Sequence, residues 1–256
     1  MDNVIISNPR EFDRKKKAFI KDRKGKIHVL SDFDRTLTKA STKSIISYLR
    51  DGRYLTKDYA PKAHALFDKY HPIEIDHNID YDEKSKKMYE WWKNHKKLII
   101  ESGFDKPTIK RCINDMIKED TLAVRDGIEE FFRYLRKNRI PLVIMSASLE
   151  DLINEFMKQK GVYSDNIYVI ANSFESKNEK AVGIKRIIHV FNKHEFELKD
   201  LPVYDELLKR KNVLLLGDSL GDLGMIEGFP YNNLIKIGFL NENVEDNLEK
   251  YKLAYD

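Results

Sequence analysis

The sequence predicts an α/β fold with a Rossmann-like parallel sheet core and an inserted helical cap domain. Two apolar runs typical of buried strands each lead into carboxylates, one into Asp32 and Asp34 and the other into Asp218 and Asp222. Residues 39–124 carry helical periodicity without a strong strand pattern, which indicates an insertion. Downstream of the insertion, helical and strand patterns alternate, as expected for a parallel sheet with helices on both faces.

The elements before and within the insertion follow from local signals. Asn8 and Pro9 are typical of a helix cap and a first helical position, and this helix is expected to end near Gly25. The strand that leads to Asp32 comes next. The insertion contains four helical patterns, and the second of them is expected to end near Pro72. The four patterns cover residues 44–50, 57–70, 81–100 and 107–118.

The remainder of the chain predicts alternating elements. Helices are expected at residues 128–137, 149–160 and 181–191, and strands at residues 141–146, 166–171, 212–216 and 235–239. We therefore expect residues 1–38 and 125–256 to form the core domain and residues 39–124 to form the helical cap domain. A cap above the strand ends can exclude bulk water from a reactive intermediate and then admit a single water molecule.

Composition limits the cellular setting. The single cysteine, Cys112, excludes an intramolecular disulfide and suits a reducing compartment. The N-terminus shows no apolar segment typical of a secretion signal, and no apolar run approaches the ~20 residues needed to span a bilayer. We therefore expect a cytoplasmic protein with no membrane partner, and we expect it to be a monomer.

Charge gives a weaker indication. The formal net charge of +4 is mildly favourable for an anionic ligand. A basic stretch extends from Arg14 to Lys26. Charge runs of this kind usually form a solvated helix face, so we favour that interpretation over a nucleic-acid-binding patch.

The two aspartates after the first strand predict the chemistry. A strand that delivers Asp32 at its carboxyl end places a carboxylate where open α/β sheets bind ligands. One acid can then attack a substrate while the other, Asp34, transfers a proton. The alternative is a pair of surface acids in a turn. Because two strands end in carboxylates, the sequence also predicts one shared Mg²⁺ site, in which Asp222 is expected to orient the ligands.

Other residues could bind an anion. The strand expected at residues 141–146 ends in Ser146, Ala147 and Ser148, whose hydroxyl and backbone N–H groups could hold a phosphate. The alternative is that Ser148 is simply the N-cap of the next helix, and the two interpretations are compatible. A lysine is expected to balance charge on a transferring phosphoryl group, and composition alone does not choose among Lys180, Lys185 and Lys193.

The Asp-x-Asp-x-Thr and Gly-Asp-x-x-x-Asp motifs resemble those of the haloacid dehalogenase superfamily. Within that superfamily, an acid at position 34 is typical of phosphatases and phosphomutases. The chain further resembles the cytosolic pyrimidine 5′-nucleotidases, also called type III cytosolic 5′-nucleotidases, along almost its whole length. The segments that carry this resemblance are Ser31–Leu37, Tyr70–Asp76, Glu90–Trp92, Ile140–Ala147, Phe191–Lys193, Leu214–Asp222 and Leu234–Asn241.

The resemblance implies Mg²⁺-dependent hydrolysis of a nucleoside 5′-monophosphate through an aspartyl-phosphate. It implies Asp32 as the nucleophile and Asp34 as the proton donor. The implied metal ligands are Asp32, Asp34 through its backbone carbonyl, and Asp218. Ser146, with the adjacent Ala147, and Lys193 are implied to contact the phosphate.

The resemblance also implies nucleoside contacts in the cap. Glu74 corresponds to the family's nucleoside-binding glutamate, although it could instead be an exposed position of an alternating segment. Of Trp91 and Trp92, one is expected to be core and the other, Trp92, to stack on a base. A tryptophan there is suited to 7-methylguanine as well as to pyrimidines. Asn94 stands where relatives have serine, so this nucleoside contact is expected to differ.

Three alternatives remain open from sequence. The chain could be a phosphatase for another small phosphometabolite, which a screen of phosphoesters would distinguish. It could be a nucleoside phosphotransferase, with an alcohol replacing water in the same site. It could also be a catalytically silent scaffold that binds nucleic acid through its basic N-terminal face, although the intact pair Asp32 and Asp34 argues against this.

Overall fold

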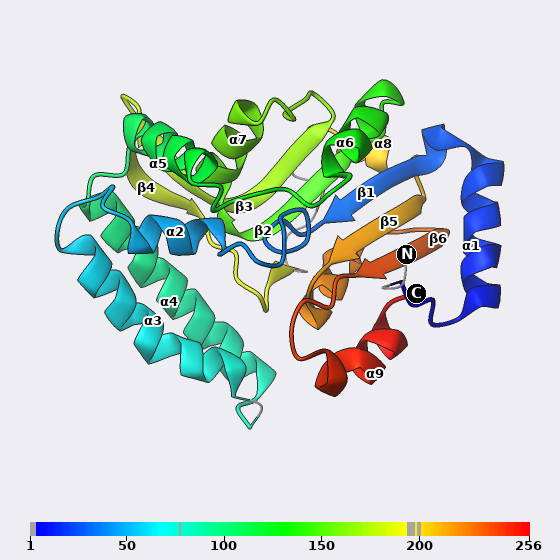
Figure 1. Ribbon diagram of the computed structural model, residues 1–256, viewed down its shortest axis with the longest axis horizontal. Coiled ribbons are helices and arrows are strands. Elements are labelled where there is room, and N and C mark those ends of the chain that lie inside the picture. Colours follow the sequence, from blue (N-terminus) through cyan, green and yellow to red (C-terminus); the bar gives the residue numbers. More distant parts are fainter. Residues whose placement is uncertain (1–3, 77, 194–197, 199–200) are drawn as a thin grey trace.

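The computed structural model describes residues 4–76, 78–193, 198 and 201–256. Its centre is a six-stranded sheet in the order β4-β3-β2-β1-β5-β6, shown in Figure 1. All neighbouring strands are parallel except β3 and β4. The predicted α/β fold is confirmed. The strands are β1 (Ile27–Ser31), β2 (Leu142–Leu149), β3 (Ile167–Lys177), β4 (Lys180–Arg186), β5 (Asn212–Gly217) and β6 (Asn233–Gly238).

Helices cover the sheet and extend beyond one edge (Figure 1). Two long antiparallel helices, α3 and α4, form a hairpin beside the sheet, while α1 and α9 lie near β6. Among the described residues, no helix has the length and apolarity that crossing a membrane requires. The α-helices are α1 (Pro9–Asp22), α2 (Ile45–Asp51), α3 (Tyr59–Ile75), α4 (Tyr81–Glu101), α5 (Lys106–Lys118), α6 (Ile128–Lys137), α7 (Glu150–Gln159), α8 (Tyr204–Leu207) and α9 (Val244–Ala254).

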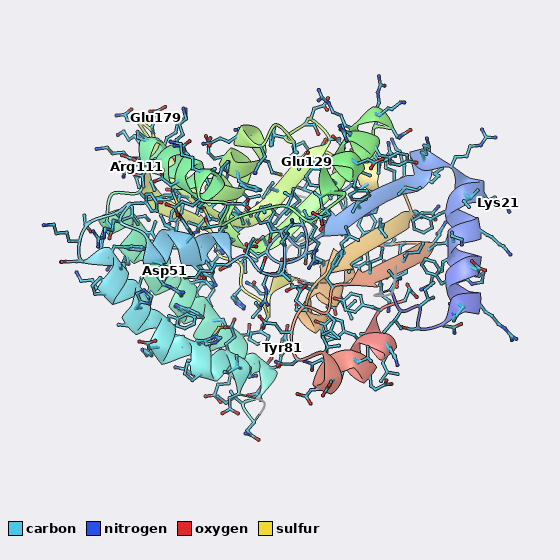
Figure 2. All side chains as sticks on the ribbon, viewed as in Figure 1. Lys21, Asp51, Tyr81, Arg111, Glu129 and Glu179 are labelled. Atoms are coloured by element: carbon cyan, nitrogen blue, oxygen red, sulfur yellow. The ribbon has the colours of Figure 1, made fainter. Side chains whose placement is uncertain are left out.

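The N-terminal helix follows its sequence signals closely. Asn8 caps α1 by accepting a hydrogen bond from the N–H of Glu11 at 3.1 Å, and Pro9 is the first helical residue. The basic stretch lies mostly on the exposed side of this helix, where Figure 2 shows Lys21 projecting outward. Some of these basic side chains form ion pairs with acidic residues of the same helix, as Arg14 does with Glu11.

The helix expected at residues 181–191 is wrong. Residues 180–186 form β4, which pairs antiparallel with β3. The connection is the two-residue turn of Asn178 and Glu179, whose φ values of 50° and 64° suit the tight turn of a β-hairpin. The hairpin fixes this segment as an edge strand, and tertiary pairing therefore overrides its helical pattern.

Two expected boundaries are also wrong. Pro72 does not end α3, which continues to Ile75, because an exposed proline near a helix C-terminus removes only one internal hydrogen bond. Ser148 is not the N-cap of α7, because β2 extends to Leu149. The N–H of Ser148 instead donates to the hydroxyl of Ser146 at 3.1 Å.

One hydrophobic cluster joins the insertion to the sheet. Its buried members include Leu49 and Cys112 from the insertion as well as Val29 and Phe156 from the core. The two connections to the insertion lie side by side, because Thr38 forms a β-bridge with Val124. The division into a core of residues 1–38 and 125–256 and a cap of residues 39–124 stays a prediction.

Two buried histidines predict acid sensitivity of the fold. Burial lowers the pKa of His28 and that of His95 to about 4, below the ordinary value of 6.5. Both rings are therefore neutral in the folded protein. Their contribution to stability is fully present above pH 6.5 and is lost as the pH falls toward 4. Between pH 6.5 and 5 we expect protonation of each histidine in the unfolded chain to remove about 1.6 kcal/mol from the free energy of unfolding.

Urea unfolding at a series of pH values tests this expectation. His95→Gln should reduce the pH slope by about one proton. His64→Gln is the matched control, because the His64 side chain is 48% exposed. An unchanged slope in His95→Gln would contradict the assignment of acid sensitivity to that residue.

Candidate active site

The register of the central strands brings the predicted carboxylates together. Ser31 pairs with Ile144 of β2 and with Leu216 of β5. The N–H of Asp32 then donates to the carbonyl of Leu216 at 3.0 Å. Because these parallel strands end at one edge of the sheet, the side chains that follow them share that edge.

Lys193 joins two carboxylates of the site. Its Nζ lies 2.6 Å from Oδ1 of Asp32 and 2.6 Å from Oδ1 of Asp222. Burial alone would lower the pKa of Lys193, but Asp222 and Asp32 outweigh burial and raise it, so the ammonium stays charged. Of the three lysines left open by the sequence, Lys180 and Lys185 are exposed and Lys193 is buried.

Three carboxylates cluster around this one lysine, so their combined negative charge exceeds its single positive charge. Oxygens of Asp32, Asp218 and Asp222 lie within 4.8 Å of one another. Burial raises the pKa of Asp32, and Lys193 opposes that shift. Burial, followed by the charge of Asp222, raises the pKa of Asp218 to about 6. The cluster therefore has the oxygen donors and excess negative charge that fit a divalent cation.

Asp222 organises the loop after β5. Its Oδ2 accepts hydrogen bonds from the N–H groups of Asp218 at 3.0 Å and Ser219 at 2.9 Å. Its Oδ1 accepts from Lys193. Because both oxygens are engaged, Asp32 and Asp218 are better placed than Asp222 to be direct ligands of a cation.

Asp34 is held by the first turn of α2. Its Oδ1 accepts a hydrogen bond from the N–H of Ile45 at 3.0 Å. Burial raises the pKa of Asp34 to about 6, and this backbone hydrogen bond opposes the shift. A carboxyl group with such a pKa exchanges protons near neutral pH, which general acid–base catalysis requires.

The predicted phosphate contacts lie at the end of β2. Ser146 is buried, and the β1–β2 register places it beside the residues that follow β1. The Ala147 carbonyl accepts a hydrogen bond from Nδ2 of Asn172 at 2.7 Å. Asn172 also pairs with both backbone groups of Ile188, five residues before Lys193. Asn172, which sequence analysis missed, thus joins the segment of Ser146 and Ala147 to the segment that leads to Lys193.

The predicted nucleoside contacts belong to the α3–α4 hairpin. Glu74 lies in the last turn of α3, not in an alternating segment, and its carboxylate is 3.0 Å from Nδ1 of His71. Asn94 is exposed, and its Nδ2 lies 3.4 Å from the Tyr70 hydroxyl. The contacts described for these two residues are within the hairpin, so their roles in binding stay predictions.

The two tryptophans have different surroundings. Trp91 stacks on Tyr70, with ring centroids 6.0 Å apart and an interplanar angle of 9°. Trp92 is partly buried, packs against the main hydrophobic cluster, and lies 5.8 Å from the His95 ring. Both are therefore partly packed, and the expectation that Trp92 meets a base stays a prediction.

Arg125 and Asn241 also support the site, although neither was given a role from sequence. Arg125 donates to the carbonyl of Thr36 at 2.8 Å, to that of Arg35 and to Oδ1 of Asn241 at 2.6 Å. Nδ2 of Asn241 lies 3.4 Å from Oδ2 of Asp218. These contacts link the segment after Asp34 to the loop that carries Asp218.

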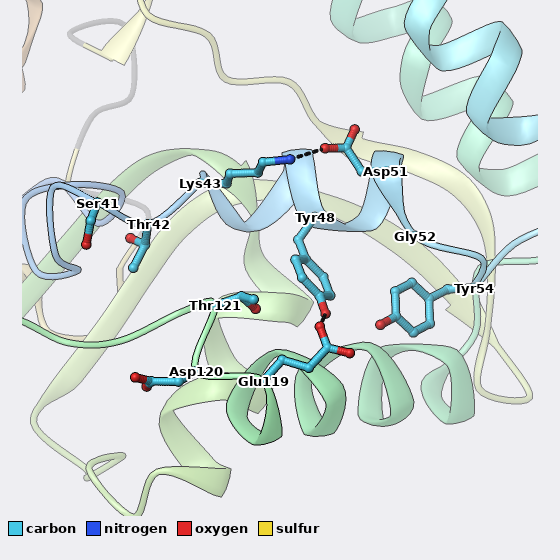
Figure 3. A pocket seen from close by; sticks show the side chains of 10 residues that line it. All are labelled: Ser41, Thr42, Lys43, Tyr48, Asp51, Gly52, Tyr54, Glu119, Asp120 and Thr121. Carbon is cyan, nitrogen blue, oxygen red and sulfur yellow. Dashed lines mark hydrogen bonds and ion pairs between the residues drawn. The ribbon is translucent and has the colours of Figure 1, made fainter.

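A cavity of about 520 Å³ lies elsewhere, along α2 (Figure 3). Tyr48 points from α2 toward Glu119 and donates a hydrogen bond to it. Lys43, which precedes α2, forms an ion pair at 2.8 Å with Asp51 at the end of that helix. The described lining consists of Ser41, Thr42, Lys43, Tyr48, Asp51, Gly52, Tyr54, Glu119, Asp120 and Thr121, so it is separate from the carboxylate cluster.

Comparison with known sequences gives a consistent answer. The model of the pyrimidine 5′-nucleotidase family matches residues 5–256. The 7-methylguanosine phosphate-specific 5′-nucleotidase A of Xenopus laevis is 34% identical over 263 residues, which cover 100% of this chain and 89% of that protein. The Homo sapiens 7-methylguanosine phosphate-specific 5′-nucleotidase is 32% identical over 261 residues, covering 99% and 86%.

Solved structures agree with the sequences. The structure of cytosolic 5′-nucleotidase IIIB bound to cytidine matches with a TM-score of 0.88 and 29% identity, covering 100% of this chain and 87% of that one. A phosphoserine phosphatase matches with a TM-score of 0.51 and 16% identity, covering 90% and 99%, which shows likeness of fold. The family predicted from the sequence motifs is confirmed: the chain belongs to the pyrimidine 5′-nucleotidase family.

Proposed function

We propose that this 5′-nucleotidase uses Mg²⁺ and the Asp32 carboxylate to hydrolyse nucleoside 5′-monophosphates to nucleoside and phosphate. The observation that carries the proposal is the cluster in which Asp32 lies against Lys193 and beside Asp218. Such a site offers a nucleophile, a fixed positive charge and oxygen ligands for a cation at one sheet edge. Phosphate release from a panel of nucleoside monophosphates, with and without Mg²⁺, tests it.

The proposed reaction has two steps. An oxygen of Asp32 forms a bond to phosphorus while the bond to the 5′-oxygen breaks, and Asp34 gives its proton to the leaving oxygen. Asp34 then takes a proton from a water molecule that attacks the aspartyl-phosphate, which restores Asp32 and releases phosphate. Lys193 and Ser146 stabilise charge on the phosphoryl oxygens.

The proposed metal ligands are Asp32, Asp218 and the backbone carbonyl of Asp34. A bound Mg²⁺ would supply positive charge to the phosphoryl oxygens. The carboxylate-rich donor set fits this cation, because Mg²⁺ favours one or two carboxylates together with phosphate oxygens.

We further propose a cytoplasmic location and a monomeric state. A solved relative of the same fold is named a cytosolic enzyme, and the one cysteine of this chain, Cys112, is a free and buried thiol. Gel filtration with light scattering measures the oligomeric state directly.

Base preference gives the next prediction. The Xenopus laevis relative is named for 7-methylguanosine phosphate and the solved relative was bound to cytidine. We expect this enzyme to accept 7-methylguanosine monophosphate alongside CMP and UMP, with GMP and AMP poorer. The electron-rich face of Trp92 would attract the cationic methylated base, and stacking worth about 1–3 kcal/mol is enough to shift the preference by about tenfold or more.

Trp92→Ala should therefore raise KM for 7-methylguanosine monophosphate more than KM for UMP. Trp91→Ala is the matched control, because Trp91 stacks on Tyr70 within the hairpin, and it should alter both values equally. If CMP and UMP are hydrolysed while the methylated nucleotide is not, the role of Trp92 is wrong and the nucleotidase proposal stands.

A further inference from the structure

We propose that Tyr251 and Tyr255 are positioning residues that fix the loop carrying Asp218. The inference rests on the proposed function, because it takes Asp218 as a metal ligand. The hydroxyl of Tyr251 donates to the carbonyl of Asp218, and that of Tyr255 donates to the carbonyl of Ser219 at 2.5 Å. The two rings stack with centroids 5.4 Å apart. Tyr251 on α9 and Tyr255 directly after it thus bind two consecutive backbone carbonyls.

Asp222 holds the backbone of Asp218 and Ser219 from the side opposite to the tyrosines. The N–H groups of Asp218 and Ser219 donate to Oδ2 of Asp222. All four backbone polar groups of Asp218 and Ser219 are therefore paired, two by a carboxylate and two by phenols. Fixed peptide groups set the point from which the Asp218 side chain extends toward Asp32, and a cation site requires that geometry before the ion binds.

Two glycines make room for the second tyrosine. A Cβ on Gly238, at the end of β6, would lie 2.5 Å from the ring of Tyr255. A Cβ on Gly217, at the end of β5, would lie 2.9 Å from its hydroxyl oxygen and 2.5 Å from Cβ of Asp222. Because glycine stands at both strand ends, the ring can lie directly against the backbone near the loop.

The end of α9 is itself anchored to the sheet. The N–H of Asp256 donates to the carbonyl of Lys236 in β6 at 3.0 Å, and the N–H of Lys236 donates to Oδ2 of Asp256 at 2.9 Å. Nζ of Lys15 on α1 lies 2.6 Å from Oδ1 of Asp256. Figure 1 shows α9 beside the loop that follows β5, close to where β6 ends. The tyrosines therefore act from a fixed support.

Removal of each hydroxyl tests the proposal. Tyr251→Phe and Tyr255→Phe keep the rings and delete the donors, and Tyr231→Phe is the control because Tyr231 is 46% exposed. Binding of the probe ion Mn²⁺ to nucleotide-free protein is measured by the loss of the free-ion paramagnetic resonance signal. Urea unfolding without metal measures stability in parallel. We expect the Kd for Mn²⁺ to rise about three- to tenfold per hydroxyl, and kcat to fall more than KM changes.

Different outcomes separate the two proposals. If the tyrosine variants lose stability but bind Mn²⁺ like the wild type, the tyrosines are structural only and the inference is overturned. If the wild type and Asp218→Asn bind Mn²⁺ equally, the proposed metal site fails instead. Should Tyr255→Phe not fold, Tyr251→Phe decides the matter, because Tyr251 is only partly buried.

Discussion

Asp32→Asn is expected to abolish turnover of every nucleoside monophosphate, with a loss on the order of 10⁴-fold or more. An amide cannot form the acyl-phosphate, so the first step of the proposed reaction has no substitute within the site. The fold should survive, because Lys193 keeps its contact with Asp222 at 2.6 Å. Phosphate release and thermal unfolding measure the two effects.

The direction of the stability change caused by Asp32→Asn can also be predicted. Burial raises the pKa of the Asp32 carboxyl, so a neutral amide removes a charge that the folded state disfavours. We therefore expect Asp32→Asn to unfold at the same temperature as the wild type or higher. Asp165→Asn, at an exposed position, is the matched control and should keep full activity. A rate above a few per cent of wild type in Asp32→Asn would rule out covalent catalysis by Asp32.

The sheet edge that carries the carboxylate cluster was predictable because it depends on local patterns. Apolar strands that lead into Asp32 and Asp218 meet wherever the sheet is parallel, since parallel strands end at one edge. The structure adds the register: the Asp32 N–H donates to Leu216. No long-range information was needed to expect these two side chains near each other.

The choice of lysine was not predictable from pattern. Lys180 and Lys185 lie on the β4 edge strand, which sequence periodicity assigns to a helix. The hairpin directs both to solvent and leaves Lys193, beyond it, buried against Asp32. Only the family resemblance indicated this residue, because its buried contacts are with Asp32 and Asp222, which lie 161 and 29 residues away in the sequence.

The residues that support the loop carrying Asp218 were likewise not predictable from the sequence pattern. Tyr251 lies 33 residues from its acceptor on Asp218, and Arg125 lies 89 residues from its acceptor on Thr36. Tyrosines on a C-terminal helix and an arginine after the insertion show no sequence spacing typical of catalysis. Their contacts exist because the fold brings both ends of the insertion and α9 to one place.

Asp34→Asn is expected to reduce nucleotide hydrolysis by about 10²–10⁴-fold, which corresponds to about 3–5 kcal/mol of activation free energy. The leaving 5′-alkoxide needs a proton, and the asparagine amide cannot donate one with comparable acidity. Because the pKa of Asp34 is raised to about 6, the donor is protonated below that pH and loses its proton above it. The wild-type kcat/KM should therefore fall above about pH 6, and the variant should lack this decline.

Comparison of two substrates separates proton transfer from the other roles that Asp34 could have. p-Nitrophenyl phosphate has a leaving group that needs little protonation, so the loss caused by Asp34→Asn should be much smaller with it than with a nucleotide. The hydrogen bond from the Ile45 N–H can be retained by the asparagine carbonyl oxygen, which keeps the α2 contact in place. Equal losses on both substrates would show that Asp34 acts through the metal or the cap, and a selective loss on the nucleotide would identify it as the acid.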